Sequence, residues 1–252
     1  YMNKEQIISS IFYPRQSRLM KDEKDHIIDT DDGEKLGIRF FIKDGNLPTI
    51  LFFHGNAELA QEYDDIAEYY NSFNLNFVVA DYRGYGLSTG IPSKENLHQD
   101  SKLIFSYVRN YMNENKYTDE LYIMGRSLGS CSAFEIIDNF SNFIKGCIIE
   151  SGFATEHPLL GLLNVNAEDI GFNLSDGFMN LEKLKNFNGK ILIIHADLDE
   201  IIPFSQAEMM ILESPSNQKE LFRVNGAGHN NVIAISREEY FVKIRDFINS
   251  NG

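Results

Sequence analysis

The sequence predicts an α/β fold in which a mostly parallel central sheet is covered by helices on both faces. Short β-rich apolar runs alternate with longer amphipathic stretches from about residue 49 to the end, as in chains built from βα units. The apolar runs are nearly continuous in hydrophobicity, as expected of strands buried on both faces. With 252 residues, 43% hydrophobic and 24% charged, the chain has the composition of one globular domain over residues 1–252.

The first expected element is an antiparallel hairpin that leads into the sheet. Its two arms, residues 26–30 and 36–43, flank Asp31-Asp32-Gly33, an Asp-Gly turn signal. The same segment resembles part of a calcium loop, but it lacks the spaced ligands and the distal glutamate, which favours the turn. Strands are then expected at 49–53, 76–81, 121–124, 145–150, 190–195 and 220–224, and helices at 58–73, 94–114, 128–139, 205–212 and 231–248.

Residues 153–184 interrupt the alternation of strands and helices. They contain no clear strand but many leucine and phenylalanine residues, and they would lie at the carboxyl edge of the strands, where α/β proteins bind ligands. We expect a short cap insertion here, with a packed helical connection as the alternative. The cap residues expected to contact a substrate are Phe153, Leu159, Leu162 and Phe178.

Charge and cysteine content narrow the classes of partner. A formal net charge of −14 argues against a nucleic-acid-binding surface, because it repels polyanions. Cys131 and Cys147 are expected to be buried free thiols, because each lies among apolar residues. We found no Cys/His spacing of the zinc type, and we expect neither a metal nor a cofactor.

Reduced thiols favour a cytoplasmic location. No apolar run reaches the roughly 18 residues of a membrane span, although peripheral contact with a membrane stays compatible with the sequence. Because Tyr1 precedes Met2, the sequence leaves open the native N-terminus and any anchor before it. It also leaves the oligomeric state open.

Residues 121–133, LYIMGRSLGSCSA, are the segment most favourable for chemistry. An apolar run leads into a Gly-x-Ser-x-Gly turn centred on Ser127, and small residues suited to starting a helix follow. A tight strand-to-helix bend exposes a serine hydroxyl to a base and to backbone amides. The short motif also arises by chance, so its context decides the interpretation.

That context includes candidates for every other part of a nucleophilic serine site. His229 follows the last expected strand and is the candidate base, while Asp197, Asp199 and Glu200 after the strand at 190–195 are candidate acids. The turn at His54-Gly55-Asn56 and the start of the helix after the serine offer backbone N–H groups of Asn56 and Leu128 to an oxyanion. His54 itself is expected to be structural.

The chain resembles the α/β-hydrolase superfamily, in particular its monoacylglycerol-lipase-like, protein-depalmitoylase-like and aminopeptidase-like serine hydrolases. The resemblance covers nearly the whole chain and implies an α/β-hydrolase fold. In the family pattern the acid stands four residues after a strand-ending histidine and shortly before a proline, which selects Asp199 to complete a triad with Ser127 and His229. This sequence differs from the family pattern at two positions: Glu58 stands where the family often has a small residue, and Ala196 stands where it often has glycine. The motifs that carry the resemblance are HGNAE (54–58), DYRGYGLSTG (81–90), GRSLGS (125–130), HADLDEIIP (195–203) and GAGH (226–229).

The resemblance and the apolar cap together predict a serine hydrolase of the carboxylesterase or lipase class that acts on a small or lipid-like ester with a hydrophobic acyl group. Thioester cleavage, including depalmitoylation, is a rival on the same triad. Aminopeptidase activity is another, and it requires an acidic anchor for the substrate amine, for which Glu150 and Glu156 are the candidates. A rival of a different class is a binding or scaffold protein without catalysis, usually marked by a damaged triad.

Overall fold

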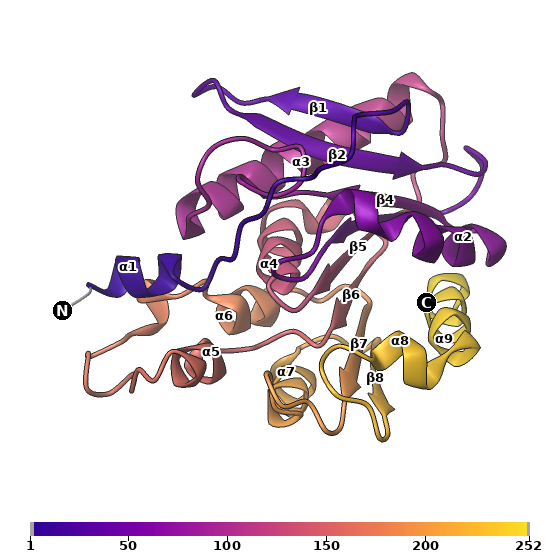
Figure 1. Cartoon of the computed structure of the whole chain (residues 1–252). Coiled ribbons are helices and arrows are strands. Elements are labelled where there is room, and N and C mark those ends of the chain that lie inside the picture. The colour runs from indigo at the N-terminus through magenta and orange to yellow at the C-terminus, as the bar shows by residue number, and fades with distance from the viewer. Residues whose placement is uncertain (1–2, 251–252) are drawn as a thin grey trace.

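The computed structural model describes residues 3–250, so the Tyr1-Met2 start considered above lies outside the described residues. Its central feature is an eight-stranded sheet (Figure 1). The predicted strands are all present, with bounds that differ by two residues at most. The strands are β1 (Asp25–Asp29), β2 (Lys35–Phe41), β3 (Thr49–Phe53), β4 (Asn76–Ala80), β5 (Leu121–Arg126), β6 (Gly146–Glu150), β7 (Ile191–Ala196) and β8 (Lys219–Val224).

The strands lie in the order β1-β2-β4-β3-β5-β6-β7-β8. β1 and β2 form the predicted antiparallel hairpin, and β2 also pairs antiparallel with β4. All the other pairs are parallel. The carboxyl ends of β3 to β8 therefore lie along one edge of the sheet, where the connecting loops converge.

Helices cover both faces of the sheet (Figure 1). Neighbouring residues of β3 point to opposite sides. Leu51 and Phe53 share a core cluster with the helices Lys94–Glu114, Gly129–Phe140, Asn180–Lys185 and Ser205–Glu213, whereas Ile50 and Phe52 share one with the helices Asp64–Ser72 and Glu238–Asn249. The predicted α/β class is thus confirmed. The longer helices are α2 (Asp64–Ser72), α3 (Lys94–Glu114), α4 (Gly129–Phe140), α7 (Ser205–Glu213) and α9 (Glu238–Asn249), with short 3-10 turns at Ala60–Tyr63, Ser141–Phe143 and Leu174–Asp176.

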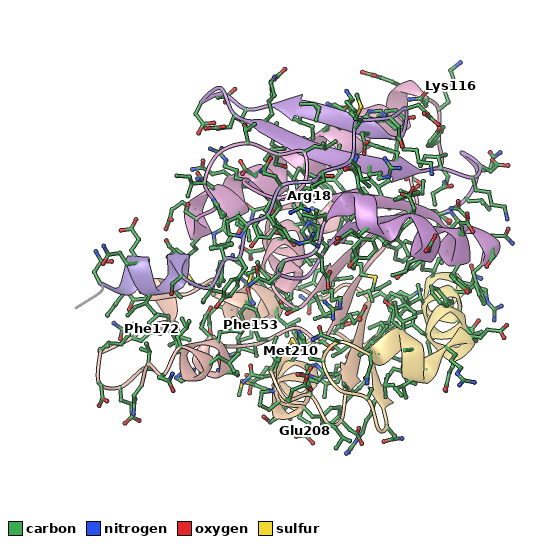
Figure 2. All side chains as sticks on the ribbon, in the orientation of Figure 1. Arg18, Lys116, Phe153, Phe172, Glu208 and Met210 are labelled. Atoms are coloured by element: carbon green, nitrogen blue, oxygen red, sulfur yellow. The ribbon has the colours of Figure 1, made fainter. Side chains whose placement is uncertain are left out.

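The helix α7 illustrates how the amphipathic pattern is used. Met210 is buried against the sheet, while Glu208, two residues earlier on the opposite face of the helix, is exposed to solvent (Figure 2). The same division of apolar and polar faces allowed this helix to be predicted within one residue of its observed end.

The predicted helix over 231–248 is divided into α8 (Val232–Ser236) and α9. Arg237 separates them with φ of +51°, a backbone conformation that non-glycine residues rarely adopt. Because no glycine or proline marks this position, the continuous apolar pattern gave no sign of the break.

Residues 153–184 contain α5 (His157–Leu162) and α6 (Asn180–Lys185) and no strand, as expected. A helix absent from the sequence prediction, α1 (Lys4–Ser9), lies beside this segment (Figure 1). Ile7 of α1 packs against Leu160 and Ala167, with Phe172 of the loop after α5 at the edge of that cluster (Figure 2). Together these parts stand beside the carboxyl edge of the sheet.

Between residues 3 and 250, no helix combines the length and the apolar character needed to cross a bilayer.

Candidate active site

Ser127 occupies a strained turn between β5 and α4. Its φ is +51°, in the left-handed region, so that the side chain projects from the bend. Two glycines make the bend possible: a Cβ on Gly125 would overlap the backbone of Gly129, and a Cβ on Gly129 would overlap the carbonyl group of Phe53. The Gly-x-Ser-x-Gly sequence is therefore required by close packing of the turn against β3.

The structure brings Ser127, His229 and Asp199 together. Nε2 of His229 lies 3.0 Å from Oγ of Ser127, and Nδ1 of His229 lies 2.8 Å from Oδ2 of Asp199. All three residues are buried. With Nδ1 donating to the carboxylate, Nε2 is free to accept the hydroxyl proton, which is the arrangement a general base needs.

His229 and two backbone amides hold Asp199 in its charged form. Its Oδ1 accepts hydrogen bonds from the N–H groups of Ile201 and Ile202, at 3.0 and 2.7 Å. Burial alone would raise the pKa of this carboxyl, but the hydrogen bond and charge of His229 and these two amides lower it below the usual range. An ionised carboxylate here stabilises an imidazolium at His229.

The other two candidate acids hold the loop that carries the histidine. Oδ1 of Asp197 accepts the N–H of Gly226 at 2.7 Å, and Oε2 of Glu200 accepts the N–H of His229 at 3.1 Å. Both carboxylates bond to the β8–α8 loop and not to the start of the following helix. They fix the approach of His229 while Asp199 contacts its ring.

Two amides face the same site. Asn56 and Leu128 line a cavity together with Ser127 and His229, and within residues 3–250 neither backbone N–H has a hydrogen-bond acceptor. The N–H of Leu128 stands at the start of α4, where the helix dipole adds positive potential. Unpaired N–H groups at this position suit an oxyanion.

The cavity has a volume of about 270 Å³ and is mostly apolar in lining. Its polar lining comes from Asn56, Arg126, Ser127, His229 and Asn230. Its apolar lining comes from Ile11, Tyr13, Leu128, Leu159, Leu162, Leu163 and Ile201.

Of the four expected cap contacts, Leu159 and Leu162 line this cavity, but Phe153 and Phe178 do not. The two phenylalanine rings pack edge to face, with centroids 6.2 Å apart, and both side chains are fully buried in the core. Figure 2 shows Phe153 inside the fold. The expectation that these two residues contact a substrate is corrected accordingly: both are core residues, and the ring of Phe178 also contacts Phe12 and His98.

The N-terminal strap, residues 10–16, forms one wall of the cavity through Ile11 and Tyr13, and no element was predicted there. The side chain of Asn56 fastens it, donating to the carbonyl of Ile11 at 2.6 Å and accepting from the N–H of Tyr13 at 3.0 Å. The hydroxyl of Tyr85 also accepts from the N–H of Tyr13, at 2.8 Å. Apolar residues at 7, 8, 11 and 12 have the spacing of a helical face, a signal that could have indicated buried structure here.

His54 is placed behind the site. Its Nε2 lies 3.1 Å from Oδ1 of Asp81, and its Nδ1 lies 2.8 Å from the carbonyl oxygen of Gly55. The side chain is fully buried and engaged at both nitrogens, in agreement with the structural role expected for it. Asp81 also accepts the N–H of Ala60, so the pair shapes the turn after β3.

The chain is similar to known hydrolases in sequence and in fold. A family model described as "Serine aminopeptidase, S33" matches residues 46–170. The chain is 29% identical over 222 residues to alpha/beta hydrolase domain-containing protein 17C of Xenopus tropicalis, covering 87% of this chain and 67% of that protein. It therefore spans about two thirds of this curated relative's length.

Two solved structures share the fold at low sequence identity. The esterase Pf2001 of Pyrococcus furiosus superposes with a TM-score of 0.74 and 16% identity, covering 93% of this chain and 97% of the esterase. A soluble variant of monoglyceride lipase from Saccharomyces cerevisiae gives a TM-score of 0.71 and 16% identity, covering 94% and 98%.

Proposed function

The chain belongs to the α/β-hydrolase superfamily, and from this premise we propose that it is a serine hydrolase that cleaves carboxylic esters with a hydrophobic acyl group. The observation that carries the proposal is the continuous chain of contacts from Asp199 through His229 to Ser127, at the mouth of an apolar cavity. An undamaged constellation argues against the scaffold alternative.

In the proposed mechanism, Nε2 of His229 takes the hydroxyl proton of Ser127 as Oγ attacks the ester carbonyl. Asp199 orients the ring and stabilises the imidazolium, and the N–H groups of Leu128 and Asn56 receive the oxyanion. The imidazolium then gives its proton to the departing alkoxide, leaving an acyl-serine. Water, deprotonated by His229, attacks the acyl-serine, and the proton returns to Oγ as the free acid is released.

The lining of the cavity supports an uncharged acyl group. Among the described residues that line the cavity none is acidic, and its one charged side chain is the cation Arg126. Over the described part of the chain, the cavity lining therefore offers no carboxylate to bind the ammonium group of an aminopeptidase substrate.

The two glutamates considered as amine anchors are occupied elsewhere. Glu150 accepts the hydroxyl of Tyr240 at 2.5 Å and lies 3.3 Å from Nε of Arg126. Glu156 accepts the N–H of Phe178 at 2.6 Å. Burial raises the pKa of both carboxyls, which weakens them as anchors for an amine. We therefore place esters ahead of amino-acyl amides, even though the matching family model is described as a serine aminopeptidase.

We also propose a single domain in which residues 153–184 serve as the cap, supported by one continuous sheet and by Leu159 and Leu162 at the cavity. The two cysteines, both buried and unpaired, support a reducing compartment such as the cytoplasm. Fractionation of cells that express the chain, followed by immunodetection, tests the location, and recovery outside the cytoplasmic fraction would contradict it.

The decisive experiment measures hydrolysis of aryl esters of increasing acyl length, a matched thioester and an amino-acyl amide by the wild type and by Ser127→Ala. Exposed Ser106 on α3 provides the matched control as Ser106→Ala. We expect wild type and Ser106→Ala to prefer esters of hydrophobic acids and to react with a fluorophosphonate probe, while Ser127→Ala does neither. Preference for the amide, or activity that survives in Ser127→Ala, would overturn the proposal; preference for the thioester would move it to a thioesterase.

A further inference from the structure

Arg126, the residue before the nucleophile, contacts the loop that carries the histidine. Its Nη2 donates to the carbonyl oxygen of His229 at 2.9 Å and to Oδ1 of Asn230 at 3.1 Å. Its backbone belongs to the turn of Ser127. A single side chain therefore ties the nucleophile turn to the loop of the base.

The same guanidinium group is paired with Glu58 in the turn after β3. Nη1 of Arg126 bonds to Oε1 of Glu58, and Oε2 of Glu58 accepts the N–H of Gly55 at 2.7 Å. The hydroxyl of Tyr63 donates to that oxygen at 2.5 Å. Glu58 thus holds the turn that carries Asn56, and it stands where the family has a frequent small residue.

A third anchor comes from β6. Nε of Arg126 lies 3.3 Å from Oε1 of Glu150, and the backbone carbonyl of Glu150 accepts the N–H of Ser127 at 2.9 Å. The side chains of Arg126, Glu150 and Glu58 are 12%, 3% and 26% exposed, so the network is partly shielded from water. Burial of charges is costly, and such a network is weak evidence for stability in itself.

We propose that the Glu58–Arg126 pair is a positioning clamp that fixes His229 and the turn of Asn56 relative to Ser127. The inference rests on the proposed function, because it assigns the pair to the geometry of that reaction. Neither side chain transfers a proton. Each acts through its neighbours: Arg126 through the carbonyl of His229, and Glu58 through the N–H of Gly55.

The clamp matters because acyl transfer depends steeply on distance. A misplacement of about 1 Å costs about 10²-fold in rate. When either partner is removed, the His229 loop and the turn at residues 54–58 lose their shared tether. The expected result is a loss in kcat that is larger than the change in KM, since the apolar residues that form most of the cavity wall are kept and Arg126 is the one lining residue that changes.

The test compares Glu58→Ala, Arg126→Met and the double variant on the best aryl ester, with kcat expressed per site titrated by a fluorophosphonate. We expect each single variant to lose between about 10-fold and 10²-fold in kcat. The double variant should lose little more than the worse single variant, because both changes break one tether. Additive losses, or a kcat per site equal to the wild type, would overturn the clamp.

The matched control is another buried ion pair, Lys183–Glu135, whose charged atoms lie 2.6 Å apart between α6 and α4. Glu135→Ala should lower Tm without changing kcat per site, which separates positioning from general stability. Arg126→Lys keeps the charge and one contact, and it should recover part of the rate lost in Arg126→Met; if Arg126→Met does not fold, the comparison of Arg126→Lys with wild type decides.

Failure of the clamp and failure of the proposed function give different results. If the wild type hydrolyses esters while the clamp variants match it, only the clamp is wrong. If the wild type neither hydrolyses esters nor reacts with the fluorophosphonate, the proposed function is wrong, and the positioning role of the clamp is wrong as well.

Discussion

Oγ of Ser127 lies 3.0 Å from Nε2 of His229, although 102 positions separate the two residues in the chain. β5 delivers the serine near the centre of the sheet, and β8, three strands away, delivers the histidine. At about 4.8 Å between neighbouring strands, the loop after β8 crosses about 14 Å of sheet edge to reach the serine. The contacts of Asp197, Glu200 and Arg126 with this loop hold it in that extended course.

Asp199→Asn should lower kcat by about 10⁴-fold while the protein stays folded. The amide keeps the size of the carboxylate but favours the wrong tautomer of His229, so that Nε2 carries a proton and cannot act as a base. Steady-state hydrolysis of an aryl ester measures the loss, with circular dichroism as the check on folding. A loss below about 10-fold would mean that another group orients the ring.

The pH dependence of stability should carry a contribution from the Asp199 carboxyl. Its pKa is lowered from 3.8, so the ionised form stabilises the fold at any pH above that unfolded value. This contribution is lost as the pH falls through the lower pKa of the folded state. The free energy of unfolding, measured by urea denaturation from neutral pH down to about pH 2, should therefore fall less steeply below pH 3.8 for Asp199→Asn than for wild type.

Acyl-chain selectivity should respond to Leu162 and not to Phe153. Leu162→Ala enlarges the cavity, so the preferred acyl chain should lengthen at nearly constant Tm, because this side chain is 56% exposed. Phe153→Ala should instead cost about 3–5 kcal/mol of unfolding free energy, with the order of preference for acyl chains unchanged. Kinetics across an ester series together with thermal unfolding measure both. A changed preference in Phe153→Ala would return that residue to the cavity wall.

Gly129 and Gly161 should respond in opposite directions to the same substitution. In Gly129→Ala the new methyl group overlaps the carbonyl of Phe53, which should cost about 1–3 kcal/mol or more. Gly161 lies in α5 with no atom within 4 Å of an added Cβ, so Gly161→Ala should stabilise by about 0.5–1 kcal/mol. Urea denaturation measures both. Equal effects would mean that the turn relaxes to admit a side chain.

The sheet was predictable because its strands are continuous apolar runs. The candidate site was predictable because Ser127, the candidate acids and His229 each follow one of those strands. The choice of Asp199 over Asp197 and Glu200 required the family pattern, since all three carboxylates face the same loop and only geometry separates their partners.

What the sequence did not reveal depends on tertiary contacts. The six residues of α1 are too few to be stable alone and are fixed by Lys4 on Asp176 and by Ile7 on Leu160. Phenylalanine content in a cap cannot distinguish a cavity wall from the core beneath it, which is why Phe153 and Phe178 were misassigned. The break between α8 and α9 at Arg237 is not marked by a glycine in the sequence.

The position of β8 also determines how the site would fail on heating. As the last strand it pairs only with β7, and most of its residues are partly exposed, whereas β5 is enclosed on both sides. An edge strand of this kind unfolds locally more readily than the strands inside the sheet. The loop of the proposed base thus follows a partly exposed edge strand, and the proposed nucleophile follows a strand in the interior of the sheet. On heating, ester hydrolysis should therefore be lost several degrees below the temperature at which the circular dichroism signal of the helices disappears. At that point the centre of the sheet, with the turn of Ser127, should still be folded.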